Sequence, residues 1–287
     1  MVTFTEKARA AMRQTKGASM LDYRKTTALV TGASSGLGAE FARALAKRGA
    51  NLILVARTKP ALEQLGTELM ERHKVRVKVF AADLASPLAR RALHSQIEAE
   101  GLAVNLLVNN AGFGLSGPFL THSLESEEAQ IDVNVAAVTA LSHLFGQNMK
   151  RFGKNSGIIN VASNAAFQPL PYSAVYSASK SFVLLFSEAL NRELRTQGTH
   201  VLAVCPGAIA TPFWGKIGSD LPDAEKSTPE RIVEEALRAF DRRQAVVVPG
   251  PFRLRLQIFS TRFAPRSFVA RVAEGASRSI MMRGREV

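Results

Sequence analysis

The chain has 287 residues, of which 46% are apolar, and a formal net charge of +13, so it is long enough to bury a sizeable core. No stretch approaches the ~18 consecutive apolar residues that a membrane-spanning helix needs, and residues 1–17 lack the apolar segment of a secretory signal. The single cysteine, Cys205, excludes an internal disulfide framework and indicates a reducing compartment, so we expect a cytoplasmic protein.

The positive charge is concentrated at the two ends of the chain. Residues 1–30 contain six Lys or Arg against two acids, and residues 251–287 contain eight against two. The ends therefore carry +10, which leaves the central domain nearly balanced, and no recognition motif is present, so we expect no nucleic-acid partner. Residues 1–25 show no strand pattern and are predicted to form a basic, disordered or loosely helical arm, within which Met20 is an alternative start.

The most informative stretch is Thr31-Gly-Ala-Ser-Ser-Gly-Leu-Gly38, which joins an apolar strand at 27–30 to a segment with one apolar helical face at 39–48. The first turn of a helix has unpaired N–H groups and a positive dipole end, and both favour a bound pyrophosphate. Glycine allows a tight turn and a close approach of the backbone to the phosphates. The coenzyme contacts predicted for this turn are Gly32, Ser34, Ser35, Gly36, Leu37 and Gly38.

Arg57 follows the second strand, about 20 residues past the glycines. In a dinucleotide-binding fold an acid at this place hydrogen-bonds the adenosine ribose and selects NAD. A carboxylate would repel a 2′-phosphate, whereas a guanidinium binds it through charge-assisted hydrogen bonds. The residue therefore favours NADP(H) over NAD(H), the alternative being a solvated surface arginine.

Strands and helices alternate along the chain, with helices of ten to fifteen residues between the strands. This pattern predicts an α/β fold in which a doubly wound parallel sheet of Rossmann type forms a single domain over residues 26–250. The predicted strands are residues 27–30, 51–55, 75–82, 104–108, 157–162, 201–205 and 245–248. Ligands of such sheets bind beyond the carboxyl ends of the strands. The candidate residues at these ends are Gly32, Arg57, Asp83 and Asn110.

Further motifs follow the glycine turn: Asn-Asn-Ala-Gly at 109–112, Tyr-x-x-x-Lys at 176–180 and Pro-Gly at 206–207. With that turn, they resemble the short-chain dehydrogenase/reductase family over about residues 26–250. The resemblance implies hydride transfer between a nicotinamide coenzyme and the carbonyl or secondary alcohol of a small molecule. It also implies coenzyme contacts from Asp83, Leu84, Asn110, Ala111, Gly112, Tyr176, Lys180, Pro206, Gly207, Ile209 and Thr211.

Tyr176 is the candidate proton donor. A free tyrosine has a pKa near ~10, and an ammonium on the same helical face would lower it, so Lys180 is predicted to depress the pKa of the phenol. Ser163 lies thirteen residues upstream, as the family pattern requires, and is predicted to bind the substrate oxygen. Tyr172 is the competing tyrosine, but no lysine lies four residues beyond it. A Tyr-x-x-x-Lys pair on a helix surface is the alternative interpretation.

Asn134 lies in an apolar stretch of a helix predicted around residues 125–151, so a buried side chain there needs a hydrogen-bond partner. It either bonds the backbone of its own helix or, as the family resemblance implies, holds a water in a proton relay. The predicted catalytic residues are thus Asn134, Ser163, Tyr176 and Lys180.

Apolar residues near these motifs predict a pocket for a bulky hydrophobic ketone or alcohol, although such residues also form ordinary core. The segment from 213 to 226 is where the family keeps a mobile substrate lid. The candidate substrate contacts are Ser163, Phe113, Leu115, Phe167, Pro169, Leu170, Phe213 and Trp214.

Residues 251–287 form a basic, amphipathic C-terminal extension. It is predicted either to pack on the domain or across a subunit interface, or to rest on an anionic membrane. The family resemblance implies a homo-oligomer, a dimer or tetramer, through the helices near 125–151 and 173–196. Two other functions remain open at this point: a dinucleotide-sensing binding protein without catalysis, and a membrane-docked reductase.

Overall fold

The structure, a computed structural model, describes residues 21–210, 227–261 and 263–281. Seven parallel strands form one sheet in the order β3-β2-β1-β4-β5-β6-β7. The strands are β1 (Thr27–Thr31), β2 (Asn51–Ala56), β3 (Val77–Ala81), β4 (Leu106–Asn109), β5 (Gly157–Val161), β6 (His200–Val204) and β7 (Val246–Val247). The order reverses between β1 and β4, so the predicted Rossmann-type, doubly wound parallel sheet is confirmed.

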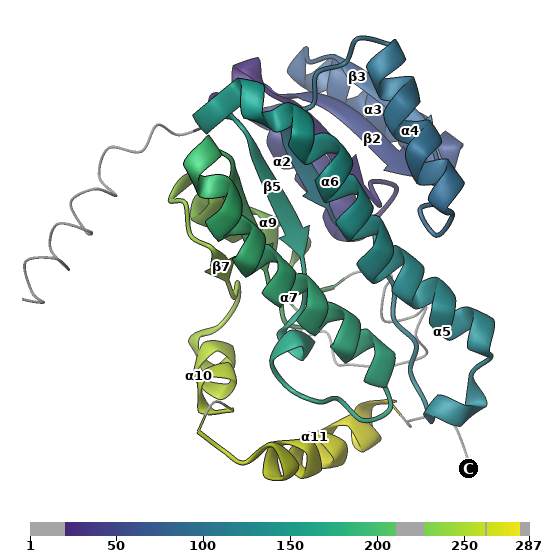
Figure 1. The fold of residues 1–287 in the computed structure, drawn as a ribbon, viewed down its shortest axis with the longest axis vertical. Helices are drawn as coiled ribbons and strands as arrows, with labels where there is room; N and C mark the ends of the chain where they lie inside the picture. The colour runs from purple at the N-terminus through teal and green to yellow at the C-terminus, as the bar shows by residue number, and fades with distance from the viewer. Residues whose placement is uncertain (1–20, 211–226, 262, 282–287) are drawn as a thin grey trace, which may run out of the picture.

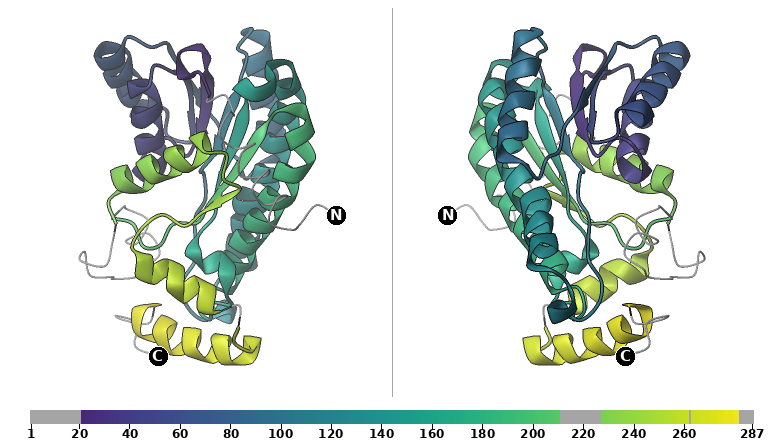
Figure 2. Two further views of the ribbon diagram at one scale, coloured as in Figure 1. Left: turned by 90° about the vertical axis from the view of Figure 1, so that its left-hand side faces the viewer. Right: turned by 90° about the vertical axis from the view of Figure 1, so that its right-hand side faces the viewer.

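Helices cover both faces of the sheet, as Figures 1 and 2 show. Leu, Ile and Phe side chains of α2 (Gly36–Lys47), α3 (Lys59–His73) and α9 (Pro229–Asp241) pack on one face. The other face is covered by α4 (Pro87–Ala99), α6 (Ala137–Met149) and α7 (Ala174–Leu194). Because both faces are buried, the central strands carry apolar side chains on both faces rather than alternating; Asn109 and Asn160, which hydrogen-bond each other, are exceptions.

The described end of the predicted N-terminal arm is packed, not loose. Leu21 is buried in the core, and a 3-10 turn, η2 (Tyr23–Lys25), leads into β1. The Tyr23 hydroxyl donates to Asp241 at 2.7 Å, and Arg48 bonds both residues. Burial and the nearby carboxylate raise the pKa of Tyr23, so it stays a donor in this cluster. Residues 1–20 lie outside the described part of the chain.

The helix predicted around residues 125–151 is not continuous. It consists of α5 (Leu124–Ile131), a π-helical turn η4 (Asp132–Ala136) and α6. A π turn inserts one extra residue, which rotates the side chains after it relative to those before it. Sequence periodicity did not indicate this insertion, and it is the turn that carries Asn134.

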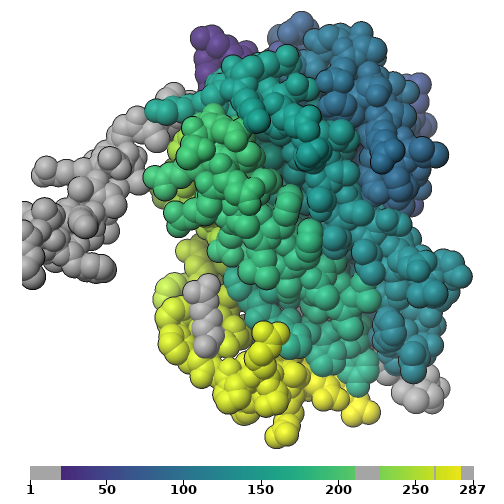
Figure 3. Space-filling view, viewed as in Figure 1, coloured from purple at the N-terminus to yellow at the C-terminus, as the bar shows by residue number. Residues whose placement is uncertain are grey.

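Two helices of the C-terminal extension, α10 (Phe252–Ser260) and α11 (Arg266–Met281), lie beyond the carboxyl ends of the strands (Figures 1 and 2). The Arg255 guanidinium anchors α10 by donating to Val248 O at 2.9 Å and to Glu235 at 3.2 Å. Val269 and Ala273 of α11 are buried. In the space-filling view a hollow is visible beside these helices (Figure 3).

Candidate active site

The turn between β1 and α2 has the backbone that a phosphate cradle needs. Gly32 and Gly36 have φ of 66° and 56°, a left-handed conformation that side chains disfavour. Ser35 is the N-cap of α2 but makes no side-chain capping bond, so the first turn of the helix keeps its N–H donors directed at the open side. An anion at this position would meet those donors and the positive end of the helix dipole.

Gly38 has a different role from the predicted one. It does not line the cavity, and a Cβ there would lie 2.2 Å from Gly32 O and 2.5 Å from Asn110 Nδ2. The missing side chain lets α2 pack against the turn and against Asn110. That amide donates to Thr31 O at 2.9 Å, while the Thr31 hydroxyl accepts the N–H groups of Asn110 and Ala111, each at 3.0 Å. Gly38 therefore serves the packing of the turn.

The ends of β2 and β3 form the outer part of the same cavity. Arg57 is exposed there, next to Asp83 and the buried Leu84. The Asp83 carboxylate accepts the N–H of Ala85 at 3.1 Å, which fixes the turn after β3. Sequence reasoning missed Arg90, a buried arginine whose Nη1 donates to Leu84 O and to the backbone of η4. Nothing in the pattern distinguished it from a surface arginine on α4.

Asn134 is fully buried behind the cavity wall and does not bond its own helix. Its Nδ2 donates to Phe113 O at 2.8 Å and to Ser179 Oγ at 3.0 Å, and its Oδ1 accepts the N–H of Phe113 at 3.1 Å. The Asn134 amide thus binds both the backbone N–H and the backbone C=O of Phe113, and in this way it fixes the chain after β4. It connects that chain to α7, which carries Tyr176.

Lys180 lies beside this arrangement. Its Nζ donates to Val161 O at 2.9 Å, and burial lowers the pKa of the ammonium to about 8. A Cβ on Gly112 would lie 2.9 Å from Asn134 Oδ1 and 3.2 Å from Lys180 Nζ. The glycine of the Asn-Asn-Ala-Gly motif therefore leaves space for two functional side chains.

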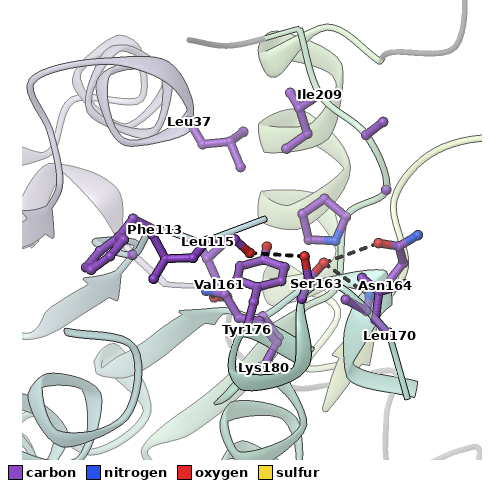
Figure 4. Close-up of a pocket in the computed structure, with 18 of the residues that line it drawn as sticks. Leu37, Phe113, Leu115, Val161, Ser163, Asn164, Leu170, Tyr176, Lys180 and Ile209 are labelled. Atoms are coloured by element: carbon purple, nitrogen blue, oxygen red, sulfur yellow. Dashed lines mark hydrogen bonds between the residues drawn. The ribbon is translucent and has the colours of Figure 1, made fainter. Parts of the chain in front are cut away.

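Tyr176 and Ser163 meet at the carboxyl end of β5 (Figure 4). Burial raises the pKa of Tyr176, and a hydrogen bond with Ser163 lowers it by less. This net direction is opposite to the predicted one, because burial dominates and Lys180 Nζ lies 5.9 Å from the ring centroid, over the ring. The phenol consequently keeps its proton at neutral pH and can act as an acid toward a bound oxygen.

A single cavity of about 800 Å³ connects the glycine turn to these residues. In Figure 4, Leu37 and Ile209 face Tyr176 and Ser163 across it. The predicted residues that line it are Gly32, Ser34, Ser35, Gly36, Leu37, Arg57, Asp83, Leu84, Asn110, Ala111, Gly112, Phe113, Leu115, Ser163, Leu170, Tyr176, Lys180, Pro206, Gly207 and Ile209. Thr211, Phe213 and Trp214 lie outside the described residues.

Phe167 and Pro169 are not brought into the cavity. Phe167 instead packs against an apolar cluster formed by α7 and the ends of β5 and β6. It is the last residue of η6 (Asn164–Phe167), and it is half-buried. The aromatic side chain is thus part of the support for α7, which is the ordinary alternative for such residues.

The chain after β4 has a second support that the sequence did not indicate. The N–H of Leu115 donates to Gln130 Oε1 at 3.1 Å, and Ser173 Oγ donates to Leu115 O at 3.1 Å. The Gln130 amide donates to Glu127, whose carboxylate also contacts His122 at 2.8 Å. The buried polar groups around Leu115 therefore fix the wall of the cavity next to Tyr176.

The largest contribution that sequence reasoning missed comes from α10 and α11. Residues of both helices and of the connection between them line the half of the cavity beyond Tyr176, namely Gln257, Ser260, Thr261, Ala264, Phe268, Val269, Val272, Ala273, Ala276 and Ser277. The amphipathic pattern predicted packing on the domain or across a subunit interface, but it did not indicate that this face would line the cavity. Among the described residues, no cluster of His, Cys, Asp or Glu could hold a metal ion, and none of the helices combines the length and the apolar composition of a membrane-spanning segment.

Comparisons with known proteins agree with this geometry. The family model described as "short chain dehydrogenase" matches residues 26–222. A very-long-chain 3-oxoacyl-CoA reductase from Anas platyrhynchos is 36% identical over 216 residues, which is 73% of this chain and 67% of that protein. A short-chain dehydrogenase from Sphingobium yanoikuyae in complex with NADPH is 35% identical, with a TM-score of 0.75, over 83% of this chain and 93% of that one. A bulky-bulky ketone specific alcohol dehydrogenase from Comamonas testosteroni is 32% identical, with a TM-score of 0.72, over 84% and 93% of the two chains.

From the hydrogen bonds of Asn134 we predict the effect of Asn134→Asp, in which the new side chain has nearly the same shape as the old one. The carboxylate loses two donors and repels Phe113 O, so the free energy of unfolding should fall by about 2–4 kcal/mol and the melting temperature by roughly 5 °C or more. Asn51→Asp is the matched control, because Asn51 uses only its oxygen, which accepts the N–H of Arg76. Calorimetry of both variants checks this, and equal melting temperatures would contradict the role of Asn134.

Proposed function

The chain belongs to the short-chain dehydrogenase family, and from that membership we propose that it is an NADP(H)-dependent oxidoreductase for a bulky, mostly apolar carbonyl compound or secondary alcohol. That it is a nicotinamide-nucleotide-dependent enzyme acting on C=O or CH–OH groups follows from the family and its relatives. One observation carries the rest of the proposal. Ser163, Tyr176 and Lys180 line the same cavity as the glycine turn after β1.

The residues present fit a nicotinamide dinucleotide, because Gly32, Gly36 and Gly112 leave backbone surface free where side chains would obstruct it. When bound, the coenzyme supplies a hydride to the carbonyl carbon. We assign the proton to Tyr176, whose hydroxyl gives it to the carbonyl oxygen, while Ser163 donates a hydrogen bond to the same oxygen. Lys180 binds the nicotinamide ribose, and Asn134, through the backbone of Phe113, holds the wall beside it.

A dinucleotide-sensing protein without catalysis is the weaker alternative. Such a protein does not need a buried tyrosine that shares a cavity with a serine and a lysine. Burial keeps the phenol protonated and lowers the pKa of Lys180 to about 8, and perturbed groups of this kind in a cleft favour proton-transfer chemistry.

Two observations support the NADP(H) preference. Arg57 is exposed at the cavity edge after β2, the side on which a 2′-phosphate would lie. The similar dehydrogenase from Sphingobium yanoikuyae was solved with NADPH. The apolar substrate is supported by Phe113, Leu115 and Leu170 in the cavity, and by the bulky-bulky ketone specificity in the name of the Comamonas testosteroni relative.

We also propose a homo-oligomer through α5, α6 and α7. Large apolar side chains are exposed on or beside these helices, including Leu120, Leu124 and Leu185 at 91%, 66% and 65%. Phe182 and Phe186 are stacked near the last of them. A second copy of the chain would cover these side chains. Sedimentation velocity tests this, and a monomer at micromolar concentration would exclude it.

We further propose that the protein is cytoplasmic and consists of a basic arm at 1–25, a catalytic domain at 26–250 and a C-terminal extension at 251–287.

The extension has an outward stripe of Phe252, Leu256, Phe259 and Phe263, each more than half exposed, in a segment with eight arginines and two acids. We propose that this stripe rests on an anionic membrane surface, because apolar and cationic side chains together favour that interface.

For the reaction, Tyr176→Phe should reduce turnover by at least about a hundredfold, because the proton donor is lost, with little change in NADPH affinity. The matched control is Tyr172→Phe, since Tyr172 is the competing tyrosine. It should keep turnover within about twofold. NADPH absorbance loss with a panel of ketones gives the rates, and coenzyme fluorescence titration gives the affinity. Retained turnover in Tyr176→Phe would refute the assignment.

For the coenzyme, Arg57→Ala should weaken NADPH binding by about tenfold or more and leave NADH binding nearly unchanged, because only NADPH carries the 2′-phosphate. Arg72→Ala removes an equal charge from an arginine of α3 outside the cavity lining and serves as the control. Isothermal titration of both coenzymes measures the difference. An equal loss for NADPH and NADH in Arg57→Ala would show that Arg57 does not read the phosphate.

For the pH dependence, Lys180 is the titrating group. Its lowered pKa of about 8 means that the ammonium loses its proton as the pH rises through that value. Its bond to the nicotinamide ribose then weakens, so kcat/KM for NADPH, which reports the free enzyme, should decline with a midpoint near pH 8. In Lys180→Arg the side chain stays charged over this pH range, so the decline near pH 8 should vanish even if the rate is lower. A flat wild-type profile well above pH 8 argues against the assignment.

For the membrane contact, replacing Phe252, Leu256 and Phe259 together by serine should abolish co-sedimentation with vesicles of phosphatidylserine and phosphatidylcholine. Each buried aromatic or aliphatic side chain contributes about 1.5–3 kcal/mol to such binding. Replacing Met70 of α3 and Leu88 of α4, which are exposed elsewhere and outside the proposed subunit interface, should leave it unchanged. Vesicles of phosphatidylcholine alone should bind weakly in every case. If the triple variant binds as well as the wild type, the stripe has another role.

A further inference from the structure

One face of α11 closes the cavity on the side away from the glycine turn. The first lining residue of the helix is Phe268, and the others follow it by one, four, five, eight and nine positions, which is the spacing of a single helical face. They are Phe268, Val269, Val272, Ala273, Ala276 and Ser277. At 1.5 Å per residue this face extends for roughly 13 Å. The wall is therefore longer than a small ketone and has room for an elongated molecule.

The wall carries no charged side chain. Arg271, Glu274 and Arg278, the charged residues of α11 nearest to it, are exposed and absent from the cavity lining. The residues that α10 adds, Gln257 and Ser260, are polar but neutral. Among the described lining residues, ionisable acids and bases occur only at Arg57 and Asp83, near the outer coenzyme end, and at Tyr176 and Lys180. The part of a substrate that contacts α11 is consequently neutral.

Two large side chains of this wall are only partly covered. Phe268 and Val272 are each 57% exposed although they line the cavity. The residues that directly follow them, Val269 and Ala273, are buried, with only 9% and 5% of their surface exposed. An apolar molecule in the cavity would remove Phe268 and Val272 from water, and this favours binding in proportion to the apolar area covered.

Ser277 is the exception in an otherwise apolar face. It is only 3% exposed, and its Oγ has no hydrogen-bond partner. A buried hydroxyl without a partner is unfavourable, and native structures rarely leave one unless a ligand or water completes it. The Oγ is covered as it stands, but Ser277 lines the cavity, so rotation about its Cα–Cβ bond would present the hydroxyl to a ligand oxygen, which would accept its hydrogen bond.

We propose that this face of α11 is the distal substrate wall, and that Ser277 binds a second oxygen of the substrate, remote from the reacting carbonyl. The inference rests on the proposed reductase function and deepens it. The substrate class is a neutral, elongated, largely apolar carbonyl compound with an oxygen acceptor toward its far end. Tyr176 and Ser163 hold the reacting oxygen, while Ser277 fixes the other end of the molecule.

The test uses a rigid fused-ring diketone with oxygens at its two ends and the monoketone of the same skeleton. The ratio of their kcat/KM values isolates the second oxygen. In Ser277→Ala this ratio should fall by about tenfold, and Ser277→Thr, which keeps the hydroxyl, should retain most of it. Glu274→Ala, on the outward side of the same helix, is the control and should leave the ratio as in the wild type. An unchanged ratio in Ser277→Ala overturns the proposal.

A second variant tests the wall independently of Ser277. Ala273→Phe fills the buried middle of the face and should lower kcat/KM for the fused-ring ketones by about tenfold or more, with a much smaller effect on cyclohexanone. Melting temperatures of all variants establish that each is folded. An equal loss for large and small ketones would show that α11 does not contact the substrate.

Binding separates this inference from the reductase proposal. In a Tyr176→Phe background with NADPH, isothermal titration should show the diketone bound more tightly than the monoketone, and Ser277→Ala should remove the difference. If that pattern appears while the wild type reduces no ketone, the reductase proposal fails and the substrate wall stands. If the two ketones bind equally, the assignment of Ser277 is wrong, and turnover alone decides the reductase proposal.

Discussion

The site depends on the hydrogen bonds that join the carboxyl ends of β1 and β4, where the strand order reverses. The Thr31 hydroxyl accepts hydrogen bonds from the N–H groups of Asn110 and Ala111, which follow β4. The side-chain amide of Asn110 in turn donates to the backbone oxygen of Thr31 in β1. Gly32 and Gly38 make this possible, since a Cβ on either would lie within 3 Å of the Asn110 amide. The phosphate turn and the start of the catalytic half are thus built as one unit.

The catalytic half relies on a second set of buried polar contacts. Asn134 holds the backbone of Phe113 and bonds α7, and Gly112 leaves the space in which Asn134 and Lys180 lie. Buried polar groups that are fully paired make an arrangement rigid, because each alternative conformation leaves a donor or acceptor unsatisfied. The π turn η4 provides the rotation that directs Asn134 toward the wall and not along its own helix.

The cavity combines two chemically different halves. Backbone N–H groups, Arg57 and Asp83 lie around the glycine turn, whereas neutral and apolar side chains of α10 and α11 surround the space beyond Tyr176. Such a division suits a charged coenzyme and a neutral substrate that meet at one phenol. Burial keeps that phenol protonated, which suits it to donate a proton to a carbonyl oxygen.

The sequence alone determined the parallel sheet and the glycine turn, because local spacing and alternation express these features directly. Ser163, Tyr176 and Lys180 were predicted from the resemblance to a known family, and the fold brings all three to one cavity. Tertiary structure decided what local pattern cannot express. Gly38 packs against Asn110, Phe167 packs against an apolar cluster beside α7, and burial raises the pKa of Tyr176 where the nearby lysine predicted a lower value. The amphipathic pattern of residues 251–281 showed that α10 and α11 have an apolar face. Only the fold, which brings segments far apart in the chain to one sheet edge, placed that face over the cavity.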